Sequence, residues 1–159
     1  MNKKTHFLTE AALIAALYVV LTLVAAMLGL ASGTIQLRLS EALTILPALT
    51  PAAIPGVFIG CILANILTGG LPWDIVFGSL ASLIGALGTY LLRGKGKWLY
   101  PLPPILANAL IVPAVLIRVY GETDAYWFLV LTVGIGEVIS AGVLGLLLYN
   151  AVRKTKLFR

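Results

Sequence analysis

The residue with the clearest potential for chemistry is an acid inside an apolar stretch. Glu137 is the only charged residue between positions 125 and 152. A carboxylate at the centre of a membrane span costs about 2.5–3.5 kcal/mol on insertion scales, so neighbouring groups must compensate it. At about 1.5 Å per residue, Glu137 lies about 16 Å along its helix from Tyr126, and Asn108 lies about 15 Å from Arg118. The two side chains can therefore meet at one depth.

A carboxylate and an amide side by side offer both acceptors and a donor of hydrogen bonds. This combination suits the edge of a planar heterocycle that carries adjacent N–H groups and a carbonyl. The alternative is a structural hydrogen bond between two helices, because such polar pairs also hold membrane helices together.

Four further polar residues stand at the ends of apolar runs. Arg38 and Glu41 are three residues apart, a spacing at which they can share a helix face and form an ion pair. Asp74 opens an apolar run, where an acid can serve as a helix cap, and Asn65 lies near the end of the preceding run. Surface pairing, capping and interhelical hydrogen bonds are the structural alternatives. These four residues, Asn108 and Glu137 all fall in the outer half of the topology derived below. We therefore predict that the six form one outward-opening ligand pocket: Arg38, Glu41, Asn65, Asp74, Asn108 and Glu137.

Motifs for catalysis or for metal and phosphate binding are lacking. His6 is the only histidine and Cys61 the only cysteine, and no phosphate-binding glycine loop, nucleophile elbow or metal-ligand spacing is present. We therefore predict a protein that is not an enzyme and that needs no cofactor or metal. Cys61 is expected to be a small core residue and His6 a solvated residue of the N-terminal tail.

The composition predicts an integral membrane protein. Of 159 residues, 60% are apolar, and the chain holds only 11 basic and 6 acidic residues. The mean hydropathy is +1.05. At about 20 residues per span the chain holds at most about six spans, which leaves no room for a soluble ATPase domain. The net charge of +5 comes from basic residues beside apolar runs, so it indicates topology rather than nucleic-acid binding.

Three basic clusters fix the predicted topology. They lie near residues 3–4, 93–97 and 153–159, and the positive-inside tendency places all three in the cytoplasm. An even number of spans must separate successive clusters, so the proline-containing run 42–73 must supply two short ones. We expect one membrane domain, residues 1–159, with both termini cytoplasmic and six transmembrane helices at about residues 8–30, 40–50, 52–68, 74–92, 101–118 and 126–150. Because the second and third are short, part of their backbone must be shielded by protein or line a wet cavity.

Small residues recur at four-residue spacing, which lets membrane helices approach closely. The first helix carries two such pairs, Ala11 with Ala15 and Ala12 with Ala16. Internal packing explains such pairs, but one face of this helix could instead dock another membrane subunit. The outer aromatic residues are expected to form an interfacial belt rather than to stack on a ligand; they are Trp73, Tyr120, Tyr126 and Trp127.

Three stretches resemble the QueT family of queuosine-precursor transporters, which are substrate-binding S components of energy-coupling factor (ECF) transporters. They are residues 35–47 (IQLRLSEALTILP), 53–66 (AIPGVFIGCILANI) and 73–90 (WDIVFGSLASLIGALGTY). The first stretch contains Arg38, Ser40 and Glu41, the second contains Asn65, and the third contains Asp74. The resemblance implies an all-α S-component bundle in the cell membrane, with a ligand site roofed by the outer loops.

The resemblance also implies partners and a substrate. The partners are a transmembrane T subunit, contacted by an alanine motif of the first helix, and two ABC-type ATPases. The substrate is a deazaguanine-type base. Three alternatives stay open: an S component for another planar vitamin, a proton- or ion-coupled carrier acting alone with Glu137 as the proton site, and a membrane assembly factor without a ligand.

Overall fold

The computed structural model describes residues 2–31 and 35–155, and within them every regular element is a helix. Lys156 and Arg159 of the C-terminal basic cluster lie outside the described residues. The elements in chain order are α1 (Lys3–Met27), η1 (Leu39–Ala48), α2 (Ala53–Leu67), α3 (Pro72–Leu91), η2 (Lys97–Leu99), α4 (Leu102–Tyr120), α5 (Tyr126–Glu137), η3 (Val138–Leu144) and α6 (Gly145–Val152).

Four helical stretches are long and apolar enough to cross a membrane, as expected of a multi-pass membrane protein. They are Lys3–Met27, Pro72–Leu91, Lys97–Tyr120 and Tyr126–Val152. The last is one continuous helix made of α5, the π-helical turns of η3, and α6. The apolar helices η1 and α2 are shorter, as the residue count of the proline-containing run predicted. The first helix begins at Lys3 and not at residue 8.

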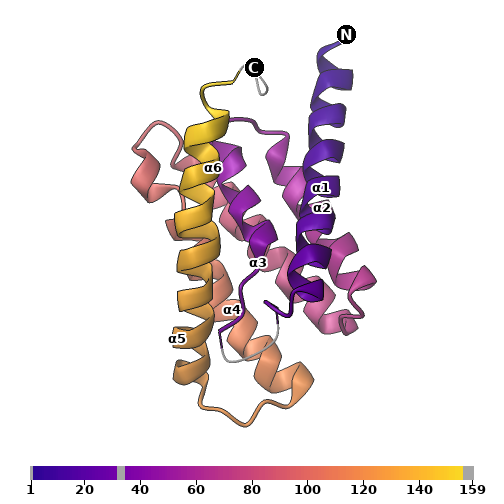
Figure 1. Cartoon of the computed structure of the whole chain (residues 1–159), viewed down its shortest axis with the longest axis vertical. Helices are drawn as coiled ribbons and strands as arrows, with labels where there is room; N and C mark the ends of the chain where they lie inside the picture. The colour runs from indigo at the N-terminus through magenta and orange to yellow at the C-terminus, as the bar shows by residue number, and fades with distance from the viewer. Residues whose placement is uncertain (1, 32–34, 156–159) are drawn as a thin grey trace.

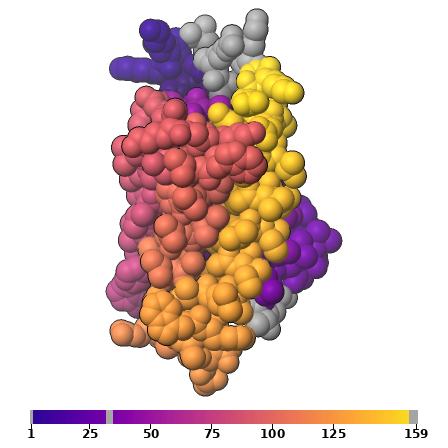
Figure 2. All heavy atoms as spheres, turned by 90° about the vertical axis from the view of Figure 1, so that its left-hand side faces the viewer, coloured from indigo at the N-terminus to yellow at the C-terminus, as the bar shows by residue number. Residues whose placement is uncertain are grey.

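The helices run up and down between two ends of the bundle. Figure 1 shows that α1 begins and α6 ends at the same end, which we call the proximal end, and that the α3–α4 connection also lies there. The α2–α3 and α4–α5 connections lie at the opposite, distal end. On one face of the molecule, α4 and the α5–α6 helix lie side by side (Figure 2). The described members of the three basic clusters thus gather at one end.

Helix η1 lies at the centre of the bundle. It contacts α1, α2, α3, η3 and α6, and all its residues from position 40 to 47 are buried. The expectation that this short segment is shielded by protein is therefore confirmed. A 3₁₀-helix rises about 2.0 Å per residue, so ten residues reach about 20 Å, further than an α-helix of the same length.

Small residues bring the helices of the bundle into close contact. A Cβ placed on Gly60 of α2 would lie 3.0 Å from Ala15 Cα and 2.7 Å from Tyr18 Cβ of α1. Ala11 and Ala15 are consequently buried against α2, whereas Ala12 and Ala16 are exposed. Cys61 is buried in the same apolar core, so its predicted role as a core residue is confirmed.

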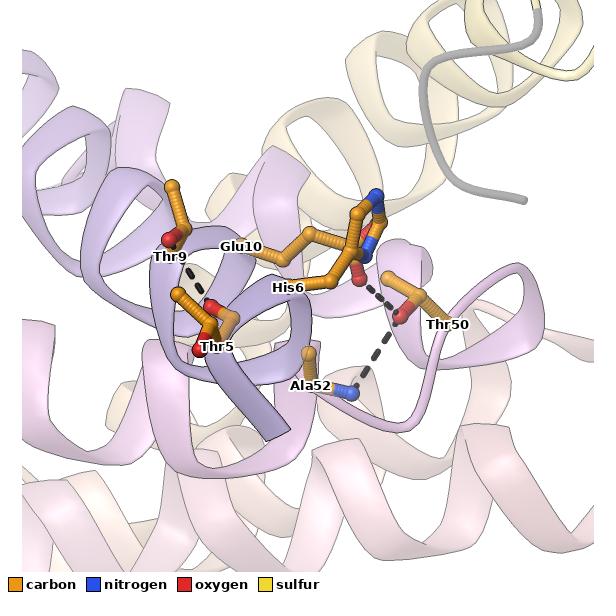
Figure 3. A network of polar contacts seen from close by, with 6 residues as sticks. All are labelled: Thr5, His6, Thr9, Glu10, Thr50 and Ala52. Atoms are coloured by element: carbon orange, nitrogen blue, oxygen red, sulfur yellow. Dashed lines mark hydrogen bonds and ion pairs between the residues drawn. The ribbon is translucent and has the colours of Figure 1, made fainter. Parts of the chain in front are cut away.

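A polar network ties the start of α1 to the η1–α2 turn at the proximal end (Figure 3). His6 Nδ1 lies 3.2 Å from Glu10 Oε1, and Thr50 Oγ1 donates to Glu10 Oε2 at 2.8 Å. Thr50 Oγ1 in turn accepts the Ala52 N–H at 3.3 Å. His6 is partly exposed but belongs to α1, so the prediction of a residue in a tail is wrong.

Candidate ligand-binding site

A cavity of about 390 Å³ opens among α1, the segment before η1, the α2–α3 connection and the last residue of α4. Its volume lies within the range of about 300–1,000 Å³ that small-molecule sites occupy. It lies at the distal end, where α2 meets α3. Three of the six predicted ligand residues line it, namely Arg38, Asn65 and Asp74.

Asp74 holds the rim of this cavity together. The hydroxyl of Tyr120 donates to Asp74 Oδ2 at 2.7 Å and accepts the Leu71 N–H at 3.3 Å. These bonds join the start of α3 to the end of α4. Tyr120, which the sequence assigned to an interfacial belt, therefore lines the cavity. Asn65 reaches into the space that Gly78 leaves free, because its Nδ2 would lie 3.3 Å from a Cβ placed there.

Glu41, fully buried, is the centre of a polar cluster beneath this cavity. Its Oε1 accepts hydrogen bonds from the hydroxyl of Tyr18 and, at 3.1 Å, from Ser82 Oγ. Its Oε2 accepts a hydrogen bond from Asn108 Nδ2 at 3.1 Å. Four elements, η1, α1, α3 and α4, thus meet at one carboxylate. A buried charge must be hydrogen-bonded, and three donors meet this requirement for the Glu41 carboxylate.

Glu137 lies beside the same amide. It is 4% exposed, interacts with the side chain of Asn108, and feels the charges of Glu41 and Arg38. The predicted meeting of Asn108 and Glu137 at one depth therefore occurs. The side chain of Asn108 thus lies near both carboxylates.

Several buried polar atoms of the described residues accept or donate no hydrogen bond. They are Ser79 Oγ, Asn108 Oδ1, Glu137 Oε2 and Ser140 Oγ. An unpaired buried polar group costs about 1–3 kcal/mol, so such atoms need an explanation. Ser140 lies one helical turn beyond Glu137, inside the π-helical turns of η3, a feature often found at functional sites.

The predicted ion pair between Arg38 and Glu41 is absent from the part of the chain that the structure describes, where no carboxylate lies within 4.0 Å of the Arg38 guanidinium. Arg38 precedes η1 with an extended backbone (φ −105°, ψ 91°), so the helical three-residue spacing does not apply. Its charge nevertheless acts on both Glu41 and Glu137. Because Arg38 and Tyr18 line the cavity as well, they connect it to the buried cluster.

The chain before η1 crosses α5 directly above the acid. A Cβ placed on Gly136 would lie only 2.1 Å from the backbone oxygen of Gln36. Glycine at position 136, the residue before Glu137, therefore allows the two backbones to come into contact. Gln36 also lines the cavity, so this crossing sets one of its walls.

Sequence reasoning missed Tyr18 and Ser82, the two hydroxyl donors to Glu41. Both are uncharged and lie in apolar helices, so charge counting does not reveal them. A signal exists for Tyr18, because it stands on the helix face of Ala11 and Ala15, one turn further on. Ser82 follows Ala81, one of the small residues of α3, and has no comparable signal.

An all-helical membrane domain with a polar cavity at one end and a buried acidic cluster beneath it has the architecture of a small-molecule membrane transporter. The chain belongs to the QueT transporter family, whose model matches residues 8–154. It is also 35% identical over 84 residues to the queuosine precursor transporter QueT of Lactococcus lactis subsp. cremoris. That stretch is 52% of this chain and 48% of the relative, so the match spans about half of each protein. No solved structure matches the chain.

Proposed function

We propose that this transporter is the substrate-binding S component of an ECF importer for a queuosine precursor, a deazaguanine-type base. The observation that carries the proposal is the pair of unpaired buried acceptors, Glu137 Oε2 and Asn108 Oδ1, beneath the distal cavity. The family and the name of the relative support the substrate class.

The chemistry of a deazaguanine base matches these acceptors. One edge of the base carries a ring N–H next to an exocyclic amine, and a carboxylate accepts from two such donors at once. Glu137 is suited to this role because its Oε2 has no hydrogen-bond partner among the described residues. The sequence assigned Asn108 to the ligand carbonyl. In the structure its Nδ2 donates to Glu41, so we assign its free Oδ1 to a further N–H of the base.

The cavity above supplies groups for the rest of the ligand. The base carbonyl needs a donor, which Arg38 in the cavity lining would provide. Asp74 and Asn65 lie where an aminomethyl substituent would reach the rim, and Asp74 would pair with its charge. Glu41 acts in this scheme through Asn108, as a positioning residue.

The proposed partners are a transmembrane T subunit and two ABC-type ATPases, with the proximal end of the bundle in the cytoplasm of the cell. In the structure the two alanine pairs of the first helix lie on different faces. Ala11 and Ala15 pack against Gly56 and Gly60 of α2, so they are not free to contact another chain. We therefore assign the T-subunit contact to Ala12 and Ala16, which are exposed.

A proton-coupled carrier acting alone is the second candidate. It is favoured by the two buried carboxylates, Glu41 and Glu137, which both lie near Asn108 and both feel the charge of Arg38. In that case Glu137 would carry the proton and no ATPase would be needed.

Two measurements decide between these functions. Isothermal titration of the purified chain with deazaguanine bases, with and without an aminomethyl group, should show stoichiometric binding that guanosine does not displace. Uptake into cells or proteoliposomes should then require coexpressed T subunit, ATPases and ATP. Failure to bind any of the bases would refute the substrate assignment, and uptake by the lone chain on a proton gradient would establish the carrier.

A further inference from the structure

A second, larger cavity lies outside the candidate ligand site. It is a groove of about 680 Å³ on the surface between α3 and α4, and none of its lining residues lines the distal cavity. Its wall is apolar except for one residue, Arg118; the apolar part includes Trp73, Phe77, Leu110, Ala114 and Val115. Because it opens on the outside of a membrane-spanning helix pair, its contents come from the membrane or from a neighbouring membrane protein.

The groove has a clear packing origin. Towards the proximal end, α3 and α4 touch, because a Cβ on Gly85 would lie 2.7 Å from Pro104 Cα and one on Gly88 would lie 2.4 Å from Pro103 Cβ. Towards the distal end α3 presents the stacked rings of Trp73 and Phe77, 6.0 Å apart, and no glycine permits close approach. The helices therefore leave a groove between their distal halves.

Arg118 is an unusual residue for such a wall. It is exposed, and in the described part of the chain no carboxylate lies within 4.0 Å and no aromatic ring lies beneath it. Leu110 and Arg118 line the same wall and lie about 12 Å apart along α4, at about 1.5 Å per residue. The groove thus leads from the middle of the apolar helix to an unpaired guanidinium at its end.

We propose that this groove binds an anionic phospholipid, with an acyl chain along α4 and the phosphate on Arg118. An acyl chain matches the apolar wall, and a guanidinium pairs with phosphate through two parallel hydrogen bonds. A free phosphate ion would leave the apolar groove unfilled, so the charge and the groove together specify a lipid. The inference rests on the membrane location alone and does not depend on the proposed substrate.

Trp73 provides a reporter inside the groove. The two other tryptophans, Trp98 and Trp127, are 72% and 73% exposed, so replacing both by phenylalanine leaves Trp73 as the single fluorophore with little disturbance. The full-length chain is reconstituted in bilayers that contain either phosphatidylglycerol or phosphatidylcholine with brominated acyl chains, and quenching of Trp73 is measured against the lipid fraction. Phosphatidylglycerol should bind about fivefold more strongly, which corresponds to about 1 kcal/mol for one arginine near the surface.

Three variants test the assignment to Arg118. Arg118→Gln should abolish the preference between the two lipids, whereas Arg118→Lys should retain most of it. Arg153→Gln, at the proximal end, should leave the preference unchanged. Ala114→Phe should fill the groove and reduce quenching by both lipids, with thermal melts confirming that each variant is folded.

Other occupants give other outcomes. Equal quenching by both lipids in the unmodified protein would indicate ordinary surrounding lipid and would overturn the proposal. A preference that survives Arg118→Gln would also overturn it. Protection of Trp73 from both lipids by a copurified T subunit would assign the groove to a partner helix instead.

Discussion

The side-chain amide of Asn108 donates to Glu41 Oε2 at 3.1 Å and at the same time lies against Glu137. This relationship gives the two acids different roles. Glu41 already accepts three hydrogen bonds and fixes the amide, whereas Glu137 retains an unpaired oxygen. The difference can be tested by making the same substitution at each acid.

Replacement of Glu137 by glutamine should weaken ligand binding and leave the fold intact. The variant keeps the shape of the side chain but turns one acceptor into a donor that faces the ligand N–H. An unpaired buried group costs about 1–3 kcal/mol, so affinity for the deazaguanine base should fall about fivefold to more than a hundredfold. Isothermal titration measures this effect, and a thermal melt without ligand is the control. Unchanged affinity would remove Glu137 from the site.

Replacement of Glu41 by glutamine should instead destabilise the protein. A glutamine side chain has one oxygen and one NH₂ group, so it cannot accept from Tyr18, Ser82 and Asn108 together. One buried donor loses its partner, at a cost of about 1–3 kcal/mol in the free energy of unfolding. Tyr18→Phe removes one donor only and should cost less. A Glu41→Gln protein that melts like the wild type would show that the cluster does not hold the helices.

Gly136 should be intolerant of a side chain. An alanine Cβ would lie 2.1 Å from the backbone oxygen of Gln36, so α5 and the segment before η1 must separate. Overpacking of this kind costs about 1–3 kcal/mol, and the shift would also disturb the cavity wall that Gln36 forms.

Gly134 supplies a matched control two residues earlier on the same helix. A Cβ placed there meets only Ala109 Cβ at 3.7 Å, an ordinary contact. Gly134→Ala should therefore be neutral or stabilising by up to about 1 kcal/mol, since alanine is the better helix former. Equal melting temperatures for the two alanine variants would contradict the close crossing at Gly136.

The helices could be predicted from the sequence because charges and apolar run lengths are properties of the chain itself. The basic clusters required two short helices between residues 42 and 73, and the structure has η1 and α2 there. The 3₁₀ form of η1 could not be predicted in this way. It depends on burial among five other elements, which no local pattern encodes.

The site could be predicted only in part, for a related reason. The charged and amide side chains stand out among apolar residues, and the structure places all six near the distal cavity or the cluster beneath it. The division of roles depends on Tyr18 and Ser82, which lie 23 and 41 residues from Glu41. Sequence spacing also failed for Arg38, because the backbone there is extended and not helical.

The exposed alanine pair of α1, Ala12 and Ala16, should carry the contact with the proposed T subunit. Ala16→Leu adds bulk to an exposed position that no other helix of the described residues covers, so the isolated protein should fold and bind its ligand normally. In the assembled transporter the added side chain would separate two closely packed helices. Copurification with a tagged T subunit should therefore decrease, and ATP-dependent uptake with it.

Ala15→Leu is the informative comparison, because Ala15 lies on the same helix but faces Gly60 of α2. Its larger side chain has no space inside the bundle, so this variant should melt at a lower temperature even without partners, by the cost of about 1–3 kcal/mol that overpacking carries. The two variants thus separate assembly from folding. If Ala16→Leu assembles and transports as well as the wild type, the proposed contact between this face of α1 and a T subunit is wrong.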